Sequence, residues 1–151
     1  MSVEAQTIDT AEALNAISAA WRDLWRRARA ATIFQHPDWL IPWWRHFAPG
    51  ELASIALWRG DNLVGLAPLY REEATRRLLP LGISLSDYLD VLIDPQASNG
   101  AAAALVDHVT AQADRWDSWE LEELSPMQPP GLCRAPRTCL KRWIRKAPVR
   151  F

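Results

Sequence analysis

ASIALWRGDNLVGLAPLY, residues 53–70, decides the fold of this chain because it places two strand-like runs around a tight turn. The runs ASIALW and LVGLAPLY are rich in the apolar residues that fill buried strands. Between them, Gly60, Asp61 and Asn62 suit a short hairpin connection, which needs residues that tolerate a positive φ angle. The stretch therefore predicts an antiparallel β-hairpin near the middle of the chain.

Further strands and one helix are predicted downstream of this hairpin. RRLLPLG (76–82) and YLDVLID (88–94) read as short strands on either side of a serine-rich bend. SWELEEL (118–124) alternates apolar and acidic residues, as a half-exposed strand does. A helix is predicted from Ser98 or Asn99 onward. Its apolar face comprises Ala102, Leu105, Val106, Val109, Ala113 and Trp116.

Two helices are predicted upstream of the hairpin. The first covers about residues 10–30, with Asp9 and Glu12 as a capping box. Its apolar face comprises Leu14, Ile17, Trp21, Leu24, Trp25 and Ala28. The second begins at Pro37, a residue that suits the first helical position. Its spacing predicts Trp39, Trp43 and Phe47 on the buried face, and leaves Trp44 as the exposed ring.

Charge divides the chain into two segments of different character. Residues 1–126 hold ten arginines, no lysine and 18 acidic residues, a net charge of −8. Residues 127–151 hold five arginines, two lysines and no acid, a net charge of +7. We therefore expect one folded lobe at 1–126, followed by a basic tail at 127–151 that is disordered or read off-frame. A basic tail can also bind nucleic acid, which is the less favoured expectation.

Composition excludes several classes of function. No apolar run approaches the roughly 18 residues of a membrane helix, and the N-terminus lacks a secretory signal pattern, so the prediction is a cytoplasmic protein without a membrane partner. Cys133 and Cys139 form neither a disulfide framework nor a zinc pattern. His36, His46 and His108 lack metal-ligand spacing, and no metal site is predicted.

The expected order of helices and strands resembles the GNAT fold of N-acetyltransferases, incomplete at its C-terminus. The sequence is also similar to the N-terminal half of bacterial cellulose-biosynthesis (CelD-type) acetyltransferase-like proteins. The stretches that carry the resemblance are ATIFQHPDWLIPWWRHFAPGEL (31–52), LVGLAPLYRE (63–72) and LGISLSDYLDVLIDP (81–95). The resemblance implies an α+β, GNAT-like first lobe, a missing second lobe, and acetyl-CoA or another acyl-CoA as cofactor of the full-length family.

In GNAT enzymes, Arg/Gln-x-x-Gly-x-Gly/Ala precedes the helix whose backbone amides hold the cofactor's pyrophosphate. The equivalent segment here is LIDPQASNGAAAAL (92–105). Gln96, Asn99 and Ala101 fit one register, next to Gly100, but Asn99 replaces the central glycine. A second register gives Ser98, Ala101 and Ala103, and loses both the lead residue and the central glycine. This eroded pattern predicts that the chain alone binds no cofactor and is inactive.

Asp87, Tyr88 and Asp90 are the other candidate site residues, as the border of a polar substrate cleft together with Trp44. Asp87 could instead cap the serine-rich bend, and Asp90 could pair with an arginine inside the fold. Asp94, before Pro95, is a turn residue.

The leading functional prediction is the first lobe of an acyltransferase. It would transfer an acyl group from a thioester to an amine or hydroxyl of a small-molecule or glycan-precursor substrate. The alternative is a non-catalytic glycan- or partner-binding module. We also expect self-association through an open sheet edge after residue 124.

Overall fold

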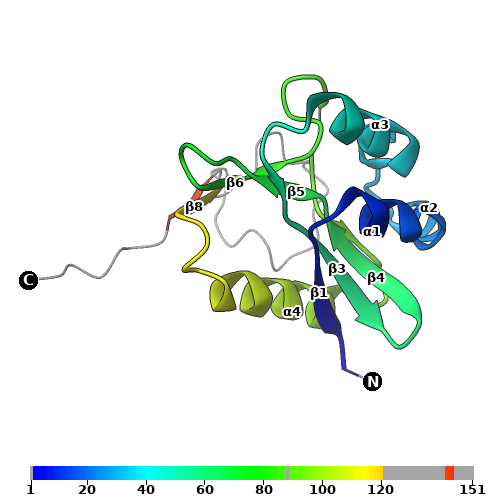
Figure 1. Ribbon diagram of the computed structural model, residues 1–151. Coiled ribbons are helices and arrows are strands. Elements are labelled where there is room, and N and C mark those ends of the chain that lie inside the picture. The colour runs from blue at the N-terminus through cyan, green and yellow to red at the C-terminus, as the bar shows by residue number, and fades with distance from the viewer. Residues whose placement is uncertain (1, 88, 121–141, 145–151) are drawn as a thin grey trace, which may run out of the picture.

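The computed structural model of the protein describes residues 2–87, 89–120 and 142–144, the last without side chains (Figure 1). The chain runs through these elements: β1 (Glu4–Ile8), α1 (Ala11–Ala16), α2 (Ser18–Arg27), a 3-10 helix η1 (Ile33–Gln35), α3 (Pro37–Phe47), β2 (Glu51–Leu52), β3 (Ser54–Arg59), β4 (Asn62–Ala67), β5 (Leu69–Arg71), β6 (Arg77–Pro80), β7 (Leu92–Ile93), α4 (Ser98–Ala111), β8 (Ser118–Glu120) and β9 (Arg142–Ile144).

The strands form two sheets, with the orders β1-β3-β4-β7 and β2-β5-β6-β8-β9. The predicted hairpin is confirmed, because β3 and β4 pair antiparallel on either side of Gly60 and Asp61. Among the described strands, β6 and β8 alone pair in parallel, and α4 is the helix of the connection between them. In the part of the chain that the structure describes, antiparallel strands, one parallel crossover and four α-helices occur together, which confirms the predicted α+β class.

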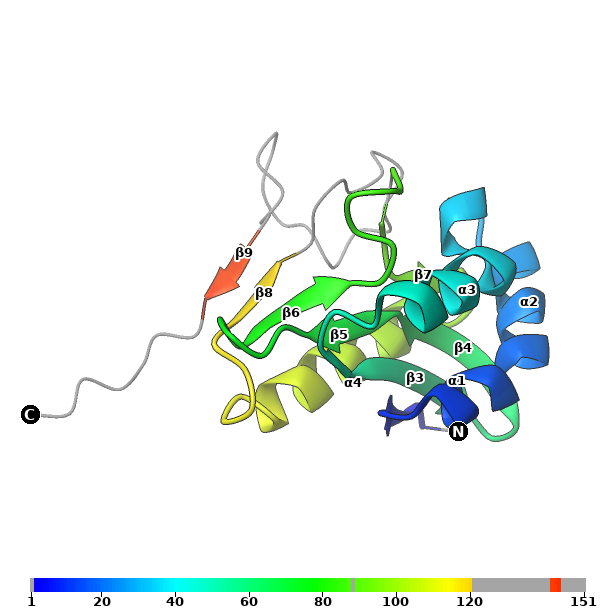
Figure 2. The same cartoon turned by 45° about the horizontal axis from the view of Figure 1, so that its top comes forward.

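A polar contact marks the place where the two sheets divide. Ser54 is completely buried, and its hydroxyl both donates to the carbonyl oxygen of Leu69 and accepts from the Leu69 N–H, each at 3.1 Å. Pro68 stands between β4 and β5 and has no N–H to donate to a ladder. Strands β4 and β5 belong to different sheets, so the chain passes from one sheet to the other at Pro68 (Figure 2).

Helices cover both faces of the sheets. In Figure 1, α1, α2 and α3 lie on one side of the strands and α4 lies on the other. The strand residues packed with the first three helices include Ile8, Leu52, Ala56, Leu63, Leu66, Tyr70, Leu79 and Leu92. Those packed with α4 include Ile55, Leu57, Val64, Ala67, Leu69, Leu78 and Ile93. The alternation follows from the two-residue period of a strand.

The N-terminal region differs from its prediction in two ways. Residues 4–8 form β1, which pairs antiparallel with β3 and was not predicted. The single helix expected at about 10–30 is two helices, separated at Ile17, and its N-cap is Thr10 instead of Asp9. The Thr10 hydroxyl accepts from the Ala13 N–H at 3.2 Å, which satisfies one of the free amides of the first turn.

The sheet edge expected beyond β8 is occupied in the structure. Strand β9 pairs antiparallel with β8, with Ser118 opposite Ile144, so β8 is an internal strand. This corrects the expectation of an open edge directly after β8. Residues 121–141 and 145–151, which include most of the predicted basic tail, lie outside the described part of the chain.

Candidate functional site

A long loop connects strand β6 to strand β7. Strand β6 pairs with β5 in one sheet, and β7 pairs with β4 in the other, so residues 81–87 and 89–91 belong to the segment that joins the two sheets. Gly82 opens the loop at φ +89° and Ser84 also has a positive φ angle. A Cβ added to Gly82 would lie 2.8 Å from Leu40 Cδ2, so this loop packs closely on α3.

The predicted carboxylates Asp87 and Asp90 lie in different environments. Asp87 is exposed. Asp90 is 5% exposed; its Oδ1 accepts from the Val91 N–H at 2.8 Å, and its carbonyl oxygen accepts from Gln35 Nε2 at 2.9 Å. The structure therefore does not present the two carboxylates to one open surface. Tyr88, the residue predicted to lie between them, is outside the described residues.

Two tryptophans of α3 exchange their predicted roles. Trp44, expected to be exposed, is 8% exposed and packs in the core, with its ring centroid 6.1 Å from that of Tyr70. Trp39, expected in the core, is 39% exposed, and Phe47 is 48% exposed. Trp43 is buried as predicted. The prediction for Trp44 was wrong because apolar residues occur on both sides of α3, and packing against Tyr70 selects which side is covered.

The turn before α4 is ordered by Asp94. Its Oδ1 accepts from the Gln96 N–H at 2.9 Å and its carbonyl oxygen accepts from the Ala97 N–H at 2.9 Å. The role predicted for Asp94 as a turn residue is confirmed. Its other oxygen, Oδ2, accepts from Arg27 Nε at 2.9 Å, so a guanidinium from α2 balances the charge of the carboxylate.

The four candidate cofactor residues divide between surface and core. Gln96, Asn99 and Gly100 are exposed, whereas Ala101 is completely buried against the sheet. A Cβ added to Gly100 would meet only Val3 Cγ2, at 3.5 Å, so the backbone is open to approach there. The first N–H groups of a helix lack intrahelical acceptors and attract anions. Residues 98–100 can therefore bind an anion, and Ala101 takes no part in the contact.

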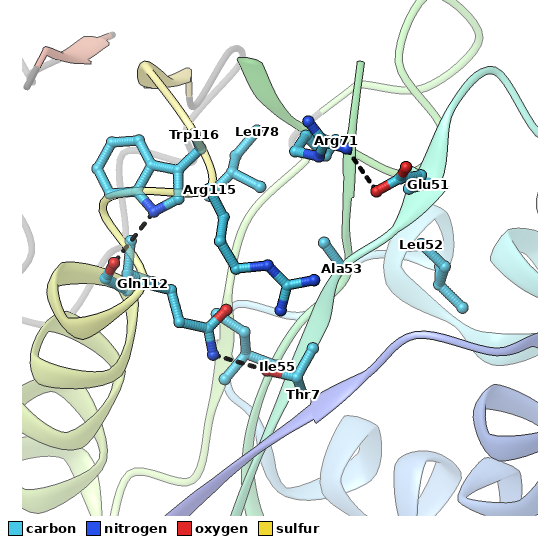
Figure 3. A pocket seen from close by; sticks show the side chains of 11 residues that line it. Thr7, Glu51, Leu52, Ala53, Ile55, Arg71, Leu78, Gln112, Arg115 and Trp116 are labelled. Atoms are coloured by element: carbon cyan, nitrogen blue, oxygen red, sulfur yellow. Dashed lines mark hydrogen bonds and ion pairs between the residues drawn. The ribbon is translucent and has the colours of Figure 1, made fainter. Parts of the chain in front are cut away.

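A concave region lies at the C-terminal end of α4, and the sequence did not predict it. It is a cavity of about 40 Å³, and the polar residues that line it are Thr7, Glu51, Arg71, Gln112 and Arg115 (Figure 3). These residues come from β1, β2, β5 and the segment that follows α4. No sequence motif could have joined them, because β1 itself was not recognised.

The described residues offer neither a cluster of metal ligands nor a membrane-spanning helix. No group of three or more histidine, cysteine, aspartate or glutamate side chains that could hold a metal ion occurs among them. Within the same part of the chain, no helix is both long enough and apolar enough to cross a membrane.

No protein-family model matches the chain, and no curated protein matches it. Among solved structures, the chain is similar to an N-acetyltransferase from Staphylococcus aureus Mu50, with a TM-score of 0.44 and 16% sequence identity. The match covers 79% of this chain and 72% of that one. A TM-score of this size does not establish a shared fold.

Proposed function

We propose that this chain is a lobe of a GNAT-like acyltransferase that holds the anionic part of a thioester donor at the start of α4. The observation that carries the proposal is the first turn of α4, where Asn99 and Gly100 are exposed and Gly100 leaves room for close approach, a short turn after β7. Ligands of open α/β sheets bind beyond the carboxyl ends of strands, where helix N-termini offer free amides. Helix α4 begins a short turn after the carboxyl end of β7, within the connection from β6 to the parallel strand β8.

The residues present fit a pyrophosphate in part. The amides of Ser98, Asn99 and Gly100 are in the first turn of α4, and Gly100 leaves room for a close approach. The backbone N–H of Gln96 already donates to Asp94 Oδ1, so it is not free to bind the pyrophosphate. The proposal therefore differs from the expectation, drawn from the eroded motif, that the chain alone binds no cofactor.

The chemistry of such a transfer is simple. A bound acyl thioester supplies an activated carbonyl carbon, and the protein aligns it with an acceptor amine or hydroxyl. A C–N or C–O bond forms at that carbon while its C–S bond breaks. The proton of the acceptor passes to a base, and the thiolate departs and takes up a proton to leave as the free thiol. In this proposal the acceptor is a polysaccharide or cell-envelope precursor, and a second GNAT-like lobe completes the active site.

Calorimetry with acetyl-CoA tests the proposal. We expect binding by the full chain. Asn99→Gly, which restores the central glycine of the motif, should lower the dissociation constant roughly 3- to 10-fold. Asn99→Asp should weaken binding, because it places a like charge against the phosphates. Asn62→Asp, an exposed change in the β3–β4 hairpin, is the matched control. No binding, or equal affinities for the two Asn99 variants, would refute the proposed donor site.

A second candidate function, glycan binding, is favoured by the geometry of Trp39. Its ring is 39% exposed and is held by a hydrogen bond from Nε1 to Ser86 Oγ, at 2.8 Å. Phe34 supports the ring edge-on, with centroids 5.8 Å apart. A fixed, exposed indole is suited to stacking on a sugar ring. Fluorescence titration with oligosaccharides tests this, since Trp39→Ala should abolish any response that Ile33→Ala, a nearby exposed apolar residue, retains.

A further inference from the structure

The cavity at the C-terminal end of α4 collects more positive than negative charge. Arg71 and Glu51 form an ion pair, with Nη2 and Oε2 2.6 Å apart. Arg115 extends a second guanidinium into the space between this pair and the side chains of Gln112 and Thr7 (Figure 3). The hydrogen bond and charge of Arg71 lower the pKa of Glu51, and the charge of Arg115 lowers it further. Two cations therefore face one carboxylate.

Arg115 has no acidic partner within the described part of the chain. The ion pairs found there use other arginines, and Glu51 is already engaged by Arg71. An arginine that is directed into a concave space without a carboxylate of its own is suited to bind an external anion.

The opposite wall of the cavity is neutral and held in place by hydrogen bonds. Gln112 Nε2 donates to Thr7 Oγ1 at 3.0 Å, and Thr7 Oγ1 lies 2.8 Å from His108 Nε2. Burial lowers the pKa of His108, which disfavours the charged form of the ring. The wall therefore adds fixed dipoles next to Arg115 without adding negative charge.

The rest of the lining is apolar. Ile55 and Leu78 come from the sheet, and Trp116, 3% exposed, comes from the segment after α4. The Trp116 indole N–H is already satisfied by the carbonyl oxygen of Val109, at 3.1 Å. A volume of about 40 Å³ suits a ligand of a few non-hydrogen atoms. An apolar surface beside the guanidinium groups of Arg71 and Arg115 favours a ligand with a short alkyl chain and one negatively charged group.

We propose that this cavity is a binding site for a small organic monocarboxylate. Its carboxylate is held by Arg115, with Arg71 beside it, and its alkyl chain lies against Ile55, Leu78 and Trp116. The site lies at the opposite end of α4 from the proposed donor site. A helix of 14 residues is about 21 Å long, so the two sites are separate, and either can fail without the other.

Nuclear magnetic resonance of the full chain tests this site, with butyrate as the probe. We expect saturable shifts in the Trp116 indole N–H, assigned through Trp116→Phe, and in the Arg115 Nε–H. Butyramide has the same shape without the charge and should give no saturable shift at matched ionic strength. Arg115→Gln, an exposed change that spares the Glu51–Arg71 pair, should weaken butyrate binding by about tenfold or more. Arg29→Gln, an exposed arginine on another face, is the matched control and should bind as the unaltered chain does.

Three results would overturn the proposal. Shifts that rise linearly without saturation would show that Arg115 is only a solvated side chain. Equal binding by the Arg115→Gln and unaltered chains would place the ligand elsewhere. Inorganic phosphate that competes as well as butyrate would show a general anion site in place of a carboxylate site.

Discussion

Arg27 connects helix α2 to the turn before α4, because its Nε–H donates to Asp94 Oδ2 at 2.9 Å. The same guanidinium donates from Nη2 to the carbonyl oxygen of Leu63, 2.7 Å away. These residues are far apart in the sequence, and the Asp94 side chain is only 12% exposed. One arginine therefore holds together α2, β4 and the start of the proposed donor site.

Removal of this contact should destabilise the protein. Arg27→Gln leaves a mostly buried carboxylate without its cation, and we expect the free energy of unfolding to fall by about 1–3 kcal/mol. Urea denaturation measures the change. Arg26→Gln, an exposed neighbour on the same helix, should change it by less than about 0.5 kcal/mol. Equal effects of the two substitutions would mean that the Arg27–Asp94 contact contributes nothing.

Replacement by alanine should change the free energy of unfolding in opposite directions at two glycines. Gly82→Ala places a Cβ 2.8 Å from Leu40 Cδ2 at a backbone φ of +89°, so we expect a loss of about 1–3 kcal/mol in the free energy of unfolding. Gly100→Ala meets only Val3, at 3.5 Å, within a helix, so we expect a gain of up to about 1 kcal/mol. Thermal melting of the two variants side by side checks both signs. Stabilisation by Gly82→Ala would contradict the loop geometry.

Stability should depend on pH through His108. Burial lowers the pKa of this ring from its ordinary value of 6.5. Below pH 6.5 the unfolded chain therefore takes up a proton that the folded chain does not. The free energy of unfolding should fall as pH decreases from 6.5 toward the folded pKa, and this group adds no slope above that range. Denaturation at a series of pH values should show the slope.

Histidine substitutions separate the contribution of His108 to this pH dependence from the contributions of other titratable groups. His108→Gln should remove the slope just below pH 6.5, whereas His46→Gln, at an exposed position on α3, should keep it. A slope that persists in His108→Gln would assign the titration to another group.

Because Trp44 is buried and Trp39 is partly exposed, their substitution by alanine should destabilise the protein to different extents. Trp44 is 8% exposed within the core, so Trp44→Ala should lower the free energy of unfolding by about 3–5 kcal/mol. Trp39→Ala removes a partly exposed ring and should cost about 1–2 kcal/mol. Chemical denaturation measures both. A larger cost for Trp39 would favour the burial pattern predicted from helical spacing.

Local sequence patterns predicted several elements well. The hairpin at residues 53–70 and the start of α4 at Ser98 are both found in the structure. Pro37 begins α3, with His36 as its N-cap, as proline geometry favours. Trp21 is fully buried, as its spacing predicted. Each of these features depends on residues near one another in the chain, where turn chemistry and periodicity operate.

Contacts between distant segments were not predictable in this way. Strand β1 has a mostly polar sequence with only Ile8 fully buried, and it is held in the sheet by backbone pairing with β3. Gln35 is 2% exposed, and both polar atoms of its side-chain amide are hydrogen-bonded. Its Oε1 accepts from the Thr32 N–H, and its Nε2 donates to the carbonyl oxygen of Asp90, 55 residues away. No periodic pattern marks either feature.

The sequence by itself determined the α+β class, the central hairpin and the position of the α4 turn, since each follows from local backbone preferences and the spacing of apolar residues. Only the tertiary structure decided that Asp90 is buried, that Trp39 instead of Trp44 meets solvent, and that Arg71 and Arg115 share a cavity. The physical reason is that burial and charge proximity depend on which elements pack together, and that packing joins residues from β1, β5 and the end of α4 that are distant in the chain.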